Sequence, residues 1–191
     1  ILGNDKYKRS IDEVFWQRKY MAGLAGAPCT LLLKKDLRVE FEREDDIQVM
    51  GYTSEEQNRV DRFRDNNNHV DLRVPLIDRG LMKNDCLAMI KNAGIELPAM
   101  YLLGYKNNNC RGCVKAQSIK YWAKIRKDFP KRFNVMAGME MITGATICKH
   151  TVDGVADVRI KLVDIPVDTP KIDDLPDIQC GIFCAIAEQE Y

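Results

Sequence analysis

The spacing of apolar residues predicts several helices in the first half of the chain. Ile11, Val14 and Phe15 recur with the helical period, and Ser10 before them is a suitable N-cap. Gly23 and Gly26 are expected to end this helix. Further helices are predicted over 31–41, from a Ser54–Gln57 capping pattern to the asparagines at 66–68, and over 85–93.

Short apolar runs between these helices predict strands. Residues 47–50 are expected to form a short buried strand that Gly51 ends, and residues 70–75 a second strand. Strands that alternate with helices are typical of an α/β domain with a mainly parallel sheet and flanking helices. We therefore expect an α/β domain of this kind over residues 1–143.

The pattern changes after Gly144. Residues 147–151 and 155–163 are strand-like and predict a β-hairpin, with a turn at Asp153-Gly154. Three prolines then mark an extended acidic tail that reaches Cys180 and Cys184. We expect the hairpin and this cysteine-containing tail, residues 144–191, to pack on the same domain.

Composition limits the class of protein. The chain has 191 residues, of which 46% are hydrophobic and 30% charged. These are values of a globular domain, and no apolar run approaches the roughly 18 residues of a membrane span. We expect a cytoplasmic protein without membrane contact. The opening Ile1-Leu2-Gly3 resembles the end of a strand, and we expect further chain upstream.

Charge is distributed unevenly although the net charge is only +1. Residues 106–132 hold nine Lys and Arg against one Asp, whereas residues 150–191 hold nine Asp and Glu against three Lys and Arg. The helix expected after Cys113 places Lys120, Lys124, Lys127 and Lys131 on one face. That face predicts an anion or nucleic-acid contact through residues 115–132, or a merely solvated helix surface.

Seven cysteines in a chain of this size indicate metal or thiol chemistry rather than a disulfide framework. Cys110-x-x-Cys113 presents two thiolates from one tight turn, which is half of a zinc or iron–sulfur site. Cys180-x-x-x-Cys184 supplies a second pair. The alternative is a set of ordinary buried thiols, which is our interpretation of Cys86 and Cys148. His69 and His150 are isolated and are not expected to be ligands or catalysts.

Four segments, in order, resemble the adenylylsulfate and phosphoadenylylsulfate (PAPS) reductase family of adenine-nucleotide α-hydrolases. The central one is Gly104-Tyr105-x4-Cys110-x2-Cys113-x-Lys115-Ala116. The others are Ala27-Pro28-Cys29-Thr30 with Leu33-Lys34, Gly51 to Arg59 with Glu55 and Glu56, and Gln179-Cys180-Gly181-Ile182. The asparagines before Cys110 and the cysteines near the C-terminus look closest to a phage-type branch.

The resemblance implies a Rossmann-like fold and action on an adenine nucleotide (ATP, adenylylsulfate or PAPS). It implies that Cys180 is the nucleophile and forms a thiosulfonate intermediate, with a thiol reductant such as thioredoxin as partner. It also implies that cations hold the phosphate or sulfate, namely Lys34, Arg59, Lys106 and Lys115. A homodimer is left open.

Two departures from the family are visible. None of the 12 glycines has a glycine neighbour, so the Ser-Gly-Gly pyrophosphate loop is absent. We expect this loop upstream; otherwise the chain cannot bind nucleotide in the family's way. Cys29 stands where iron–sulfur members have adjacent cysteines. The metal set is therefore either Cys110, Cys113, Cys180 and Cys184, as for zinc, or Cys29, Cys110, Cys113 and Cys184, as for a cluster.

Three functions follow as hypotheses. The first is thiol-dependent reduction of a sulfonucleotide. The second keeps the fold but transfers sulfur to nucleic acid at the expense of ATP, which the basic helix favours. The third is a metal-stapled binding or regulatory protein without catalysis, which the absent glycine loop favours.

Overall fold

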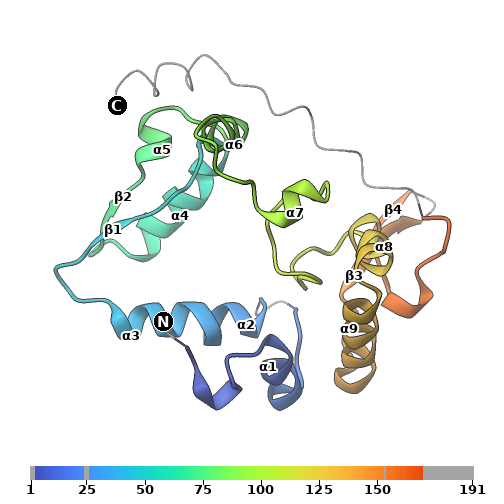
Figure 1. The fold of residues 1–191 in the computed structure, drawn as a ribbon. Helices are drawn as coiled ribbons and strands as arrows, with labels where there is room; N and C mark the ends of the chain where they lie inside the picture. The colour runs from blue at the N-terminus through green and yellow to red at the C-terminus, as the bar shows by residue number, and fades with distance from the viewer. Residues whose placement is uncertain (1–2, 24–25, 153, 170–191) are drawn as a thin grey trace. The chain divides into compact units, whose positions relative to one another are not determined.

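The computed structural model describes residues 3–23, 26–152 and 154–169, apart from the side chain of Ala156 (Figure 1). These residues form two compact units. The described part of the first covers 3–41 and 109–169 with those gaps, and that of the second covers 42–108. The domain boundary predicted at residue 143 falls within the first unit. The predicted cysteine tail at 180–184 lies outside the described residues.

The first unit begins with η1 (Asp5–Tyr7) and α1 (Ile11–Arg18). The predicted N-cap of α1 is confirmed, because the Ser10 hydroxyl accepts a hydrogen bond from the Glu13 backbone N–H at 3.4 Å. Val14 and Phe15 are fully buried. The helix ends earlier than the predicted glycines, where Lys19 adopts a left-handed conformation with φ of 49°.

The second helical segment starts earlier than the predicted residue 31. It consists of α2 (Pro28–Thr30), the π-helix η2 (Leu31–Lys35) and α3 (Asp36–Phe41) in direct succession. Pro28 occupies the first helical position, where its missing N–H and fixed φ are favourable. Asn4 donates to the carbonyl of Leu32 at 3.1 Å and ties this segment to the start of the chain.

Two helices, α8 (Ile119–Asp128) and α9 (Pro130–Thr143), carry the core of the first unit. Pro130 occupies the first position of α9, where its missing N–H and fixed φ are favourable, so the helix predicted to reach Lys131 is divided in two. Trp122, Ile125 and Met136 are fully buried. The Trp122 ring lies edge-on to that of Tyr121, and its indole N–H donates to the Ala116 carbonyl at 2.7 Å.

An antiparallel pair of strands packs on these helices. β3 (Cys148–Val152) pairs with β4 (Val155–Ile160) in the region of the expected hairpin, and η4 (Leu162–Asp164) follows. β4 ends before the predicted residue 163. The buried carboxylate of Glu140 in α9 accepts from the backbone N–H groups of Ile147 at 2.7 Å and Leu162 at 2.8 Å. This one side chain therefore fixes to α9 the end of the strand pair at which β3 begins and β4 ends.

The second unit contains a small parallel sheet. β1 (Ile47–Val49) pairs in parallel with β2 (Asp71–Arg73), and η3 (Ser54–Glu56) and α4 (Gln57–Asn66) connect them. Three short helices follow, namely α5 (Pro75–Asp78), α6 (Lys83–Asn92) and α7 (Ala99–Leu102). Figure 1 shows α4 beside the two strands. The described chain is thus mixed α/β, and its parallel sheet has two strands.

Two details of this unit correct the sequence prediction. The capping box is formed by Thr53 and Glu56 rather than by Ser54 and Gln57, because the Glu56 carboxylate accepts from the Thr53 N–H. The strand over 47–50 is not buried within the described residues, since Ile47 is 51% and Val49 66% exposed. A central strand of a parallel sheet is normally covered on both faces, so the exposure of β1 among the described residues differs from that of such a strand.

Candidate functional site

The turn that carries Cys110 and Cys113 is the centre of the candidate site. Gly112 between them has φ of +69°, and a Cβ there would lie 3.3 Å from Cγ of Met136 in α9. A glycine is therefore required by both the backbone conformation and the close approach to α9. Cys110 is exposed and Cys113 half-buried.

Tyr121 fixes this turn through its hydroxyl group. The hydroxyl accepts from the Cys113 backbone N–H at 3.0 Å and donates to the Cys110 carbonyl at 3.2 Å. Burial raises the pKa of Tyr121 to about 12, against the lowering effect of backbone N–H groups. The phenol thus stays protonated and keeps both bonds over the ordinary pH range. No pattern in the sequence indicates this role of the Tyr121 hydroxyl.

Cys29, in the first turn of α2, lies within electrostatic range of the same turn. Burial raises the pKa of its thiol above the usual value, and Cys113 and Cys110 raise it further. Lys115 and a hydrogen bond with Thr30 lower that pKa. The structure therefore brings together three cysteines and one lysine that the sequence singled out.

The predicted metal ligands are described only in part. Cys180 and Cys184, which belong to the proposed ligand sets, lie outside the described residues. Within 3–23, 26–152 and 154–169, no group of three or more His, Cys, Asp or Glu side chains could hold a metal ion. The thiols of Cys110 and Cys113 thus affect Cys29 electrostatically, but the three cysteines do not form a complete metal-binding group.

The predicted anion-binding cations lie in both units. Lys34, in η2, and Lys115, just after the cysteine turn, are exposed side chains of the first unit. Arg59 of α4, in the second unit, pairs with Glu56 and stacks over the Tyr52 ring at 4.8 Å. Part of its hydrogen-bonding capacity is therefore already used.

Lys106 is also in the second unit, and its surroundings contain a residue that sequence reasoning missed. Lys83 donates through Nζ to the Lys106 carbonyl and, at 2.9 Å, to Oδ1 of Asn107. The backbone N–H of Lys83 donates to the Glu55 carboxylate at 3.0 Å. Lys83 therefore links the predicted Glu55 segment to the asparagine run before Cys110. No local sequence signal indicates a link across this many residues.

The predicted basic face is not continuous. Lys120, Lys124 and Lys127 belong to α8, but Lys131 belongs to α9, because Pro130 starts a new helix. Lys124 is ion-paired with Asp128 at 2.9 Å. The structure thus divides the lysine stripe on which the nucleic-acid interpretation rested.

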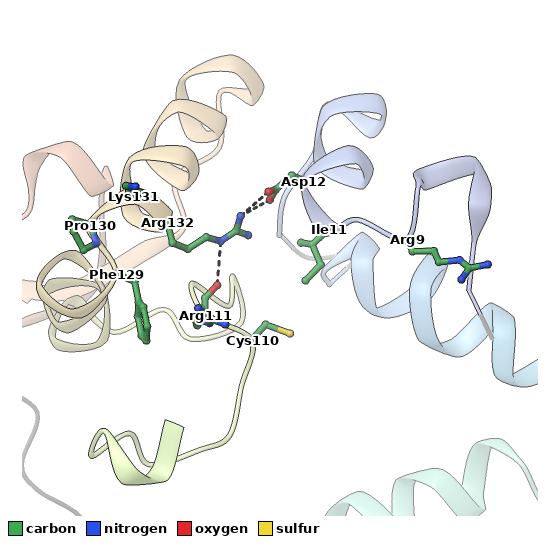
Figure 2. A pocket seen from close by; sticks show the side chains of 9 residues that line it. All are labelled: Arg9, Ile11, Asp12, Cys110, Arg111, Phe129, Pro130, Lys131 and Arg132. Carbon is green, nitrogen blue, oxygen red and sulfur yellow. Dashed lines mark hydrogen bonds and ion pairs between the residues drawn. The ribbon is translucent and has the colours of Figure 1, made fainter. Parts of the chain in front are cut away.

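A cavity of about 710 Å³ lies beside Cys110 in the first unit (Figure 2). Its floor includes Arg132 of α9, which reaches toward Asp12 of α1 and donates through Nη1 to both carboxylate oxygens at 2.7 Å. Nε of the same guanidinium donates to the Arg111 carbonyl at 3.2 Å. Arg132 therefore joins α1, α9 and the cysteine turn. Arg132 and Asp12 are 120 residues apart, and no pattern in the sequence indicates their pairing.

The two remaining cysteines of the described residues are in different environments. Cys148 in β3 is fully buried, and burial raises its pKa to about 11. Cys86 in α6 is half-buried, and burial, followed by the nearby carboxylates of Asp85 and Glu55, raises its pKa. Both thiols stay protonated near neutral pH, as expected of structural cysteines.

Within the described residues, none of the helices combines the length and apolar character needed to cross a lipid bilayer. No protein-family model, curated protein or solved structure matches this chain.

Proposed function

We propose that this protein acts on an adenine nucleotide or sulfonucleotide in the manner of PAPS reductases, with tail and turn thiols as its chemical groups. The observation that carries the proposal is that Cys110, Cys113 and Lys115 lie within electrostatic range of Cys29. They come from two segments about 80 residues apart, and both segments carry motifs of that family. Coincident motifs that also converge in space are stronger support than motif order alone.

The second unit supports the fold part of the proposal. Parallel pairing of β1 and β2 across α4 is the connection from which Rossmann-like sheets are built. The proposed domain is therefore of the adenine-nucleotide α-hydrolase type, to which β1 and β2 contribute two strands.

The proposed reaction begins at Cys180. Its thiolate attacks the sulfur of the sulfonucleotide, the bond from sulfur to the bridging oxygen breaks, and the adenosine phosphate leaves with that oxygen. The product on the chain is a thiosulfonate. One thiolate of a dithiol reductant of thioredoxin type then attacks the Cys180 sulfur, which releases sulfite and forms a mixed disulfide. The second thiol of the reductant attacks its own sulfur in that disulfide, which frees the Cys180 thiol and leaves the reductant as an internal disulfide. Lys34, Arg59, Lys106 and Lys115 are the proposed phosphate and sulfate ligands.

The metal proposal keeps two ligand sets. The zinc set is Cys110, Cys113, Cys180 and Cys184. The cluster set, Cys29, Cys110, Cys113 and Cys184, leaves Cys180 free as the nucleophile. An iron–sulfur cluster would be held in this set by four thiolates, the usual ligands of such clusters. Elemental analysis and an ultraviolet–visible spectrum of anaerobically purified protein decide the metal: iron with brown colour supports this set, and zinc without visible absorption supports the other.

The activity test is sulfite release from PAPS and from adenylylsulfate, with thioredoxin supplied. We expect sulfite from the full-length wild-type protein and none from its Cys180→Ser variant, whereas Cys86→Ser, remote from the turn in sequence, serves as the matched thiol control. An undiminished rate in Cys180→Ser would refute the nucleophile, and a full-length wild-type protein that releases no sulfite from either substrate would refute the reductase.

A further inference from the structure

The cavity beside Cys110 has an excess of positive charge. Its lining includes four cations, Arg9, Arg111, Lys131 and Arg132, against the single carboxylate of Asp12. Asp12 is neutralised by Arg132, and Arg9 pairs with Asp5 at 2.8 Å. Arg111 and Lys131 remain, and neither has a carboxylate partner among the described residues. Two unpaired cations that line one cavity attract an anion.

Arg132 adds a donor whose position is already fixed. Its Nε and Nη1 atoms are held by the Arg111 carbonyl and by Asp12, while Nη2 donates to no described residue. The side chain is only 22% exposed. A guanidinium held at two points loses little conformational entropy when its third nitrogen binds a ligand.

The other walls of the cavity are apolar. Ile11 and Pro130 belong to them, and the Phe129 ring lies next to the Arg111 guanidinium, 5.4 Å from ring centre to Cζ (Figure 2). The volume of about 710 Å³ is that of a small-molecule site rather than of a site for a single ion. Such a site suits a molecule that has an anionic group and a less polar body.

We propose that this cavity binds a phosphate or sulfate ester, with its oxyanion among Arg111, Lys131 and Nη2 of Arg132 and its body against Ile11 and Phe129. The proposal goes beyond the proposed function, because it concerns a different set of cations and needs no thiol reaction. A tetrahedral oxyanion offers several acceptors, which match the donors of arginine and lysine.

The test is calorimetric titration of the full chain with adenosine 5′-monophosphate, inorganic phosphate and sulfate. We expect Lys131→Met and Arg111→Met each to weaken adenosine monophosphate binding roughly tenfold, as loss of one charge-assisted hydrogen bond does. Lys127→Met is the matched control. It removes the same charge from an exposed lysine of α8 that does not line the cavity. The affinity of this variant for adenosine monophosphate should stay within about twofold of the wild type.

Each outcome decides the proposal. Equal losses in Lys131→Met and Lys127→Met would show an effect of overall charge and overturn the site, as would no binding of any of the three probes. Inorganic phosphate that binds as tightly as the monophosphate would overturn the part played by the apolar wall. The titration needs no thiol and the sulfite assay needs no cation of this cavity, so a protein that binds the monophosphate but releases no sulfite would uphold the cavity and refute the proposed function.

Discussion

The hydroxyl of Tyr121 accepts a hydrogen bond from the backbone N–H of Cys113 at 3.0 Å. Together with its bond to the Cys110 carbonyl, this contact shapes the cysteine turn from the core of the unit rather than from the turn itself. The turn therefore depends on packing of α8 as well as on its own glycine.

Tyr121→Phe should destabilise the protein by about 1–2 kcal/mol, because it leaves a partly buried N–H and a carbonyl without their partner. Urea unfolding measures this change. Tyr52→Phe, which removes a hydroxyl in the second unit, is the control and should change the free energy of unfolding by less than about 0.5 kcal/mol. Equal effects of the two substitutions would contradict the role of the Tyr121 hydroxyl.

The pH dependence of Cys29 alkylation tests whether the three thiols are close. Burial and the neighbouring Cys113 and Cys110 raise the Cys29 pKa, so its reaction with iodoacetamide should rise only at alkaline pH. Replacing Cys110 and Cys113 by serine removes an effect that raises the Cys29 pKa, so the midpoint of Cys29 alkylation should move to lower pH. Lys115→Met removes an effect that lowers the Cys29 pKa, so this midpoint should move to higher pH.

Peptide mass spectrometry after timed alkylation gives the Cys29 rate separately from those of the other cysteines. Lys120→Met is the control for Lys115→Met, since Lys120 is not among the groups that act on Cys29. If the alkylation midpoint of Cys29 moved in the same direction in the double serine variant and in Lys115→Met, the proximity of these groups to Cys29 would be contradicted.

Arg132 and Asp12 should be energetically coupled across the first unit. A double-mutant cycle with Arg132→Met and Asp12→Asn is expected to give a coupling energy of about 1 kcal/mol, because one nitrogen bonds both carboxylate oxygens and the arginine is largely buried. The Asp5–Arg9 pair is the control. Its side chains are 80% and 58% exposed, so its coupling should be below about 0.5 kcal/mol. Equal coupling in both pairs would count against a linking role for Arg132.

Glu140→Ala should be among the most destabilising single substitutions, at about 2–4 kcal/mol, because it leaves the buried N–H groups of Ile147 and Leu162 unpaired. Thermal or urea unfolding measures the loss. Asn134→Ala, at an exposed position of the same helix, should cost less than about 0.5 kcal/mol. A small loss of unfolding free energy in Glu140→Ala would mean that water replaces the carboxylate as the acceptor of these two hydrogen bonds.

The helices that depend on local signals are those that the sequence predicts best. Ser10 and Pro130 act through atoms within four residues, so their effects on α1 and on α8 and α9 follow from residue type alone. The capping box was displaced by one residue because Thr53 and Ser54 are adjacent and equally suitable caps. The predicted burial of Ile47 was wrong, because the apolar residues of a strand do not reveal whether other elements cover them.

The site divides in the same way. The spacing of Cys110 and Cys113 predicts a half-site without a structure, because two thiols separated by two residues share one turn. Arg132 and Asp12 are 120 residues apart, and Lys83 and Asn107 are 24 apart, so only the fold brings them together. Glu140 resembles any helical glutamate until its two backbone partners are seen.

The π-helix η2 sets the rotation of Cys29 relative to α3. A π-helical turn holds about one residue more than an α-helical turn, so deleting one residue from 31–35 would restore a regular α-helix in which Cys29 and Asp36 keep about the same angle. If all of these residues instead formed a regular α-helix, Cys29 would turn by roughly 100° about the axis relative to Asp36. The extra residue therefore gives Cys29 a different angle relative to α3 from the one that an uninterrupted α-helix of the same sequence would give.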